Sequence, residues 1–277
     1  MVESSALSTL IRQWPVEHAS AVVVSSAGIE ATVGPTDQRF ELASVTKLLS
    51  AFTCLVAIEE ETIASDDPVP VELGAPEGAT VAHLLAHASG LDPDRRETVA
   101  EVGTRRIYSN AGFEILGELV AARAGIAFDT YLREAVTGPL AMTATTLDGS
   151  PAHGAHSCVD DLARFAVELL EPTLVAPATL EMATTAFLPD LAGVLPGFGR
   201  QEPNPWGLGL EIRGDKHPHW TGSRNSARTF GHFGRAGTFL WVDPVAGLAA
   251  VVLTDRTFGP WAAEVWPTWS DTVLGSG

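Results

Sequence analysis

The sequence predicts an α+β fold in which strands from both ends of the chain form one antiparallel sheet flanked by helices. Strand-like apolar runs occur near the N-terminus and again after residue 206, while helical periodicity fills the middle. With 277 residues, 45% of them hydrophobic, the chain is large enough for a sizeable core. We therefore expect one folded unit over 1–277, with an α/β subdomain (1–60 and 200–277) and an inserted, mainly helical subdomain (61–199).

The N-terminal part is predicted to begin with a helix and a hairpin. Helical periodicity covers residues 4–13. The apolar runs at 21–25 and 29–33 indicate two strands, which the pair Ala27-Gly28 joins in a turn.

The segment 40–58, FELASVTKLLSAFTCLVAI, contains a nearly all-apolar helix from Val45 onward. A helix that is apolar on every side is buried. Lys47 is the one charged side chain that interrupts it, and Ser44 lies three residues earlier at the expected helix start. This spacing places the two side chains on the same face of the helix.

Two interpretations of Ser44 and Lys47 are open at this point. Burial favours the neutral form of a lysine, and a neutral amine can take the proton of a serine hydroxyl and make it a nucleophile. The N–H groups at the helix start would then bind an oxyanion. Alternatively, Ser44 only caps the helix and Lys47 extends to water. Because Ser-x-x-Lys is short and common, the pattern alone favours the second interpretation.

The middle of the chain is predicted to be mainly helical. Loop-like segments rich in Gly, Pro or polar residues interrupt it at 65–78, 91–103 and 189–205. The predicted helices are 81–89, capped by Thr80, then 111–124, 128–136, 159–170 and 180–185.

Strand patterns return after Trp206. The predicted strands are 208–212, 229–233, 238–242 and 248–254. A turn over 243–247 joins the last two as an antiparallel hairpin, and an amphipathic helix over 260–274 closes the chain.

Composition argues against several classes of function. The net charge of −17, from 17 basic and 34 acidic residues, would repel nucleic acid and anionic membranes. We find no signal-peptide pattern and no run of about 18 apolar residues, and therefore expect a cytoplasmic protein. The two cysteines, Cys54 and Cys158, are expected to be free thiols.

The histidines offer no complete metal-binding pattern. His83 and His87 are four residues apart on a predicted helix, and His153 and His156 are close in sequence, but no carboxylate or cysteine completes either set. The segment 217–219 is expected to be a surface loop. There is also no G-x-S-x-G elbow and no glycine-rich phosphate loop. We expect no metal and no cofactor.

Three short motifs follow one another along the chain: Ser44-Val45-Thr46-Lys47, Tyr108-Ser109-Asn110 and His232-Phe233-Gly234. Their order resembles the SxxK, YxN and (K/H)TG triplet of the serine β-lactamase and penicillin-binding-protein superfamily, specifically the branch of class C β-lactamases, DD-peptidases and esterases. Further segments resemble signatures of that branch: 84–91 (LLAHASGL), 108–112, 138–143, 160–165 and 231–239. The ordered set favours the chemical interpretation of Ser44 and Lys47.

The resemblance implies a role for each motif residue. Ser44 would be the acylated nucleophile, and Lys47 would help to deprotonate it. Tyr108 would be the second proton-transfer group; its phenol normally titrates near ~10, so as a base it needs a cation such as Lys47 nearby. Asn110 would hydrogen-bond the acyl amide of the substrate or Lys47, and its alternative role is an N-cap of the following helix.

The third motif is expected to recognise the substrate. The backbone N–H groups of Ser44 and Arg235 would form the oxyanion hole, and Gly234 would let the substrate approach the backbone. His232 replaces the commoner lysine and Phe233 the usual threonine hydroxyl. Arg235 either replaces the lost charge or is a surface residue.

The resulting prediction is a serine hydrolase that acts through an acyl-enzyme on a small ester or amide. The altered third motif weakens the case for efficient β-lactam hydrolysis. The alternatives are a D-amino-acid peptidase or β-lactamase, and a non-catalytic sensing module of penicillin-binding type. The sequence predicts no oligomeric state.

Overall fold

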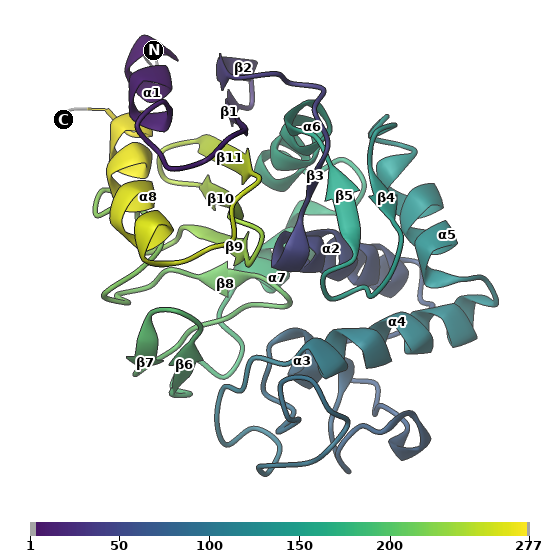
Figure 1. Cartoon of the computed structure of the whole chain (residues 1–277). Helices are drawn as coiled ribbons and strands as arrows, with labels where there is room; N and C mark the ends of the chain where they lie inside the picture. Colours follow the sequence, from purple (N-terminus) through teal and green to yellow (C-terminus); the bar gives the residue numbers. More distant parts are fainter. Residues whose placement is uncertain (1–3, 276–277) are drawn as a thin grey trace.

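A computed structural model describes residues 4–275 and confirms the predicted α+β fold (Figure 1). Its main sheet has six strands in the order β2-β1-β11-β10-β9-β8, and all neighbours are antiparallel. Because β1 pairs with β11, the sheet joins the two ends of the chain. The strands are β1 (Ala19–Ser25), β2 (Gly28–Val33), β8 (Glu211–Ile212), β9 (Phe230–Gly234), β10 (Thr238–Asp243) and β11 (Leu248–Thr254).

Helices cover both faces of this sheet. On one face lie α1 (Ser4–Ile11) and α8 (Pro260–Val273), which contact each other and appear side by side in Figure 1. On the other face lie α2 (Thr46–Glu59) and α6 (Val159–Leu170). Alternation along the strands divides their apolar side chains between two cores. In β10, Trp241 packs on the α8 side and Leu240 on the α2 side.

Most of the regular structure in the middle of the chain is helical. The predicted helix 128–136 is α5 (Phe128–Leu132) followed by a turn of π-helix, η3 (Arg133–Thr137), in which the Gly138 N–H bonds to Arg133 O. Its α-helices are α3 (Val81–Leu85), α4 (Asn110–Ala124), α5 (Phe128–Leu132), α6 and α7 (Pro177–Thr184), and its single turns are η2 (Val71–Leu73) and η3 (Arg133–Thr137). The helix α6 lies within the predicted helical subdomain but packs on β1 and β11 of the main sheet. The subdomain boundaries at 60/61 and 199/200 stay predictions.

Several short elements differ from the sequence-based expectation. The segment 189–205 is not an irregular connection, since it contains a hairpin of β6 (Gly193–Leu195) and β7 (Gly199–Gln201). The predicted strand 208–212 pairs only at Glu211–Ile212. A small sheet in the order β3-β5-β4 was not predicted; its strands are β3 (Phe40–Glu41), β5 (Ala155–Ser157) and β4 (Thr146–Leu147). Strands of two or three residues are too short to show a period of two.

The apolar helix and the cysteines behave as expected. Every residue from Thr46 to Ala57 in α2 is buried. Cys54 and Cys158 are buried free thiols. Within residues 4–275, no helix has the length and apolar character that a membrane span requires.

Gly231 in β9 gives a test of how tightly the central sheet is packed. Its φ is +156°, and a Cβ there would lie 2.1 Å from Leu240 O. We expect Gly231→Ala to lower the free energy of unfolding by about 3–5 kcal/mol, through backbone strain and overpacking together. Gly28→Ala is the matched control, since Gly28 has φ +117° but no atom within 4 Å of the added Cβ. Urea denaturation should show a clearly smaller loss for the control; equal losses would contradict the packing argument.

Candidate active site

Ser44 lies in a tight turn between β3 and α2. The turn is the 3₁₀ segment η1 (Ala43–Val45), and Val45, not Ser44, is the N-cap of α2. The expectation that Ser44 caps the helix is therefore wrong. Ala43 has φ 45°, a left-handed conformation that non-glycine residues rarely adopt. The turn is tied to the sheet because the Thr238 hydroxyl donates to Leu42 O at 2.8 Å.

Lys47 is fully buried beneath this turn, so the interpretation that its side chain extends to water is wrong. Its Nζ donates to Asn110 Oδ1 at 2.7 Å and to Ala152 O at 2.9 Å, and lies 3.5 Å from Ser44 Oγ. Burial lowers the pKa of Lys47 to about 7, although the charges of Asp94 and Glu114 partly oppose this shift. A neutral amine has two N–H groups, and both have acceptors here. Its lone pair is then free to face Ser44 Oγ.

Tyr108 is the second side chain that contacts Ser44 Oγ. Its phenol O–H donates to Ser44 Oγ at 2.7 Å, and its ring centroid lies 4.6 Å from Lys47 Nζ. Burial raises the pKa of Tyr108 above its usual value, more than the hydrogen bond to Ser44 lowers it. The phenol is therefore protonated near neutral pH. Ser44 Oγ accepts a proton from the phenol and can donate its own to the amine.

Asn110 orients Lys47 and does not cap α4. The N-cap is Ser109, whose hydroxyl accepts from the Gly112 N–H, so the alternative N-cap role of Asn110 is wrong. The Asn110 side chain accepts from Lys47 through Oδ1 and donates through Nδ2 to Asp94 Oδ1 at 2.7 Å. Sequence reasoning missed Asp94, because nothing local separates it from the other acids of its loop.

His232 lies on the site face of β9, with its ring centroid 5.6 Å from that of Tyr108. Its Nδ1–H donates to Phe233 O at 2.6 Å, which leaves Nε2 as an acceptor. Burial and the charge of Lys47 lower the pKa of His232 to about 3, so the ring is neutral at pH 7. It therefore does not supply the positive charge of the lysine it replaces.

The rest of the third motif borders the serine turn. A Cβ at Gly234 would lie 2.4 Å from Leu42 O and 3.2 Å from Ser44 N, so glycine permits the close approach of β9. Phe233 points mainly to the opposite face of the sheet, where it packs on Phe258 at 4.9 Å. The Arg235 side chain is exposed just beyond β9.

A cavity of about 420 Å³ opens over Ser44. Among the predicted site residues, Ser44, Tyr108, Asn110, His232 and Arg235 line it, and Phe233 reaches its wall. Lys47 lies beneath it and Gly234 borders the serine turn. The structure thus brings residues from three distant parts of the chain to one opening.

A buried ionic cluster beside the cavity was not predicted from the sequence. Glu211 lines the cavity and accepts from Lys216 Nζ at 2.8 Å and from Trp220 Nε1 at 2.6 Å; it also pairs with His219 Nε2 at 2.9 Å. Burial would raise the pKa of Glu211, but the charges and hydrogen bonds of Lys216 and His219 bring it well below its usual value. The expected surface loop 217–219 is therefore wrong at His219, which is buried.

The side chains of His83 and His87 have structural contacts. His83 forms a capping box with Thr80, and His87 Nδ1 accepts the Ser109 N–H at 3.1 Å. In residues 4–275, one group of three side chains has potential metal ligand atoms close together, namely the exposed Glu17, His18 and Asp255. Neither histidine pair belongs to it.

The fold and this arrangement of motifs define a member of the serine β-lactamase and penicillin-binding-protein superfamily. The model of the family described as Beta-lactamase matches residues 16–271, so the chain belongs to that family. No curated protein sequence matches the chain.

Three solved structures illustrate the relationship. A β-lactamase (Mb2281c) from Mycobacterium bovis is 52% identical, with a TM-score of 0.94 over 97% of this chain and 98% of that one. EstCE1, a hydrolase with promiscuous acyltransferase activity, is 17% identical, with a TM-score of 0.81 over 98% and 97%. An octameric penicillin-binding protein homologue from Pyrococcus abyssi is 19% identical, with a TM-score of 0.75 over 94% and 74%. The last two likenesses show the fold alone.

The Glu211 cluster predicts a large stability effect. Glu211→Gln leaves the buried Lys216 charge without its carboxylate, and we expect a loss of about 3–5 kcal/mol in the free energy of unfolding. Glu202→Gln is the control, because it removes a 2.9 Å pair with Arg200 that is largely exposed and worth at most about 1 kcal/mol. Chemical denaturation measures both, and a loss below about 1 kcal/mol for Glu211→Gln would contradict the assigned pairing.

Proposed function

We propose that the protein is a serine hydrolase that cleaves a small ester or amide through an acyl-enzyme on Ser44. The main support is the convergence of Tyr108 and Lys47 on Ser44 Oγ, at 2.7 and 3.5 Å, beneath an open cavity. Membership of the Beta-lactamase family supports the same class of chemistry. We also propose that the protein is located in the cytoplasm.

Acylation begins with transfer of the Ser44 proton to the neutral amine of Lys47. Ser44 Oγ attacks the carbonyl carbon, and the N–H groups of Ser44 and Arg235 stabilise the oxyanion. As the bond to the leaving group breaks, the Tyr108 phenol donates a proton to the leaving oxygen or nitrogen, and the lysine ammonium restores the phenol proton. In this scheme Tyr108 acts first as an acid, consistent with its raised pKa.

Deacylation repeats these transfers with water in place of Ser44. Water gives a proton to the Lys47 amine and attacks the acyl carbon. As the acid is released, the Tyr108 phenol gives a proton to Ser44 Oγ, and the Lys47 ammonium restores the phenol proton. Asn110 holds the Lys47 amine toward this reaction centre, because Asp94 holds the Asn110 amide in one orientation.

A β-lactamase or D-amino-acid peptidase is the second candidate. It is favoured by the 52% identical relative from Mycobacterium bovis, which is described as a β-lactamase. It is disfavoured by Phe233, whose ring offers no hydroxyl to a substrate carboxylate. The non-catalytic sensing module is the third candidate, and multiple turnovers of any substrate would exclude it.

Ser44→Ala tests the nucleophile. We expect a fluorophosphonate or fluorescent penicillin to label the wild type at Ser44, as mapped by mass spectrometry, and the variant to lose labelling and turnover. Ser5→Ala, which changes an exposed serine of α1, should keep both. Undiminished labelling of Ser44→Ala would defeat the assignment. A panel of p-nitrophenyl esters, nitrocefin and D-Ala-D-Ala peptides then separates the candidate activities.

The acylation rate should depend on pH through Lys47. Because the neutral amine is the base and its pKa is about 7, the rate should rise through about pH 7 and level off above it. His232, with a pKa of about 3, keeps one protonation state across this range. Lys47→Met should lower the rate about 100- to 10,000-fold and remove this rise. Stopped-flow kinetics measures the profile, and an unchanged midpoint in Lys47→Met would exclude Lys47 as the base.

A further inference from the structure

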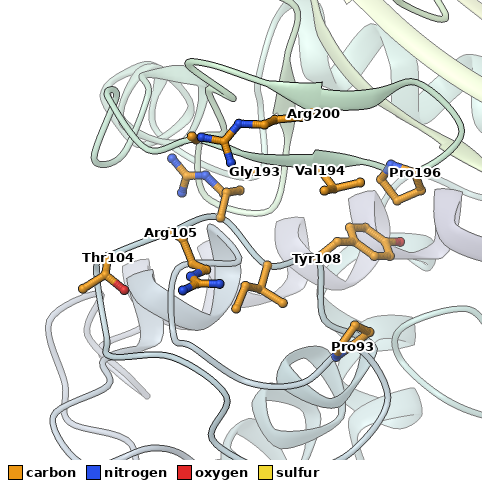
Figure 2. A pocket seen from close by; sticks show the side chains of 11 residues that line it. Pro93, Thr104, Arg105, Tyr108, Gly193, Val194, Pro196 and Arg200 are labelled. Atoms are coloured by element: carbon orange, nitrogen blue, oxygen red, sulfur yellow. The ribbon is translucent and has the colours of Figure 1, made fainter.

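A second cavity, of about 670 Å³, adjoins the one over Ser44. Pro93, Tyr108 and Pro196 line both cavities, so the two share a wall. Figure 2 shows Tyr108, Pro196 and Pro93 at one end of this second cavity, and Thr104, Arg105 and Arg200 toward the other. The site thus extends past Tyr108 along a pocket that the chemistry at Ser44 does not itself require.

Apolar side chains form the part of this pocket near Tyr108. Ile107 and Val194 line the pocket together with Pro93 and Pro196. Val194 lies on the β6–β7 hairpin and is 61% exposed, although valine gains free energy when covered. The hairpin is attached at the pocket because the Arg106 N–H donates to Ala192 O at 2.9 Å. An apolar chain lying in the pocket would cover Val194.

The far end of the pocket is positively charged. Arg105 is exposed, and within residues 4–275 no carboxylate lies within ion-pair distance of it. Arg200 pairs only with Glu202, and both side chains are 68% exposed, so this pair is weak. Arg106 also lines the pocket, but its buried guanidinium donates to backbone carbonyls, including Ala86 O at 2.7 Å. In a chain of net charge −17, this end is locally basic and would attract an anion.

We propose that the leaving group of the substrate is an apolar chain ending in a carboxylate, which lies in this pocket and pairs with Arg105. The inference rests on the proposed function. In that function Tyr108 protonates the leaving group, and Tyr108 is one of the three residues, with Pro93 and Pro196, that line both cavities. The part of the substrate beyond Tyr108 is therefore the leaving group and not the acyl group. A planar guanidinium is well matched to a carboxylate.

The test compares esters that differ only in where the charge lies. One pair has an acetyl group and a six-carbon alcohol that ends in either a methyl group or a carboxylate; a second pair carries the same difference on the acyl chain. We expect kcat/KM to be about 10-fold higher for the alcohol with the carboxylate, and this preference to fall in Arg105→Gln and at high salt. Arg123→Gln, an exposed arginine of α4 away from both cavities, should keep the preference.

The outcomes separate this inference from the proposed function. If neutral esters are hydrolysed through Ser44 but the charged alcohol gives no advantage, or the charged acyl chain gives the larger one, the inference is wrong and the function stands. If neither an ester nor an amide is hydrolysed through Ser44, the proposed function fails. Calorimetry of 6-hydroxyhexanoate and hexanol binding to Ser44→Ala then tests directly whether the pocket binds the carboxylate. Tighter binding of the carboxylate that Arg105→Gln abolishes would support the pocket, and equal binding would overturn it.

Discussion

The buried amine of Lys47 is the constraint on which the rest of the site depends. An ammonium group costs several kcal/mol to bury without an ionic partner, and the contacts of Lys47 are an amide and a backbone carbonyl. The protein accommodates the side chain by lowering its pKa to about 7. The same low polarity that would make Lys47 a poor structural cation makes it suitable as the proposed base.

Polar groups of α2 also hold the segment 151–155 beside Lys47. Along the helix, Thr46 accepts the Ala155 N–H, Lys47 donates to Ala152 O, and Ser50 donates to Pro151 O. These three bonds fasten the segment 151–155 to an otherwise apolar helix. On the other side, Gly234 lets β9 approach the serine turn closely. The serine turn and the start of α2 are therefore fixed in place before any substrate arrives, which is the preorganisation that oxyanion stabilisation requires.

In the proposed function, recognition and acylation use largely different residues. The proposed acylation groups come from η1, α2, the start of α4 and, for Tyr108, the end of the loop before α4. The residues proposed to select the substrate come from β9, the loop before α4 and the β6–β7 hairpin, most of them partly exposed. Change in these segments can alter the substrate while the buried core stays intact, which agrees with the varied activities described for relatives of similar fold.

The sequence by itself determined the fold class, the buried helix and the motif residues, because these depend on local periodicity and on the order of short patterns. A helix without a polar face must be buried, so Lys47 was conspicuous before its partners were known. Only the tertiary structure decided that Ser44 lies in a 3₁₀ turn, that Asp94 orients Asn110 and that Glu211 binds Lys216 and His219. The first depends on a strained turn that Ala43 adopts under tertiary contacts, and Asp94 and His219 lie in loops that look polar in sequence. Their contacts are set by how distant segments pack, which local propensity does not encode.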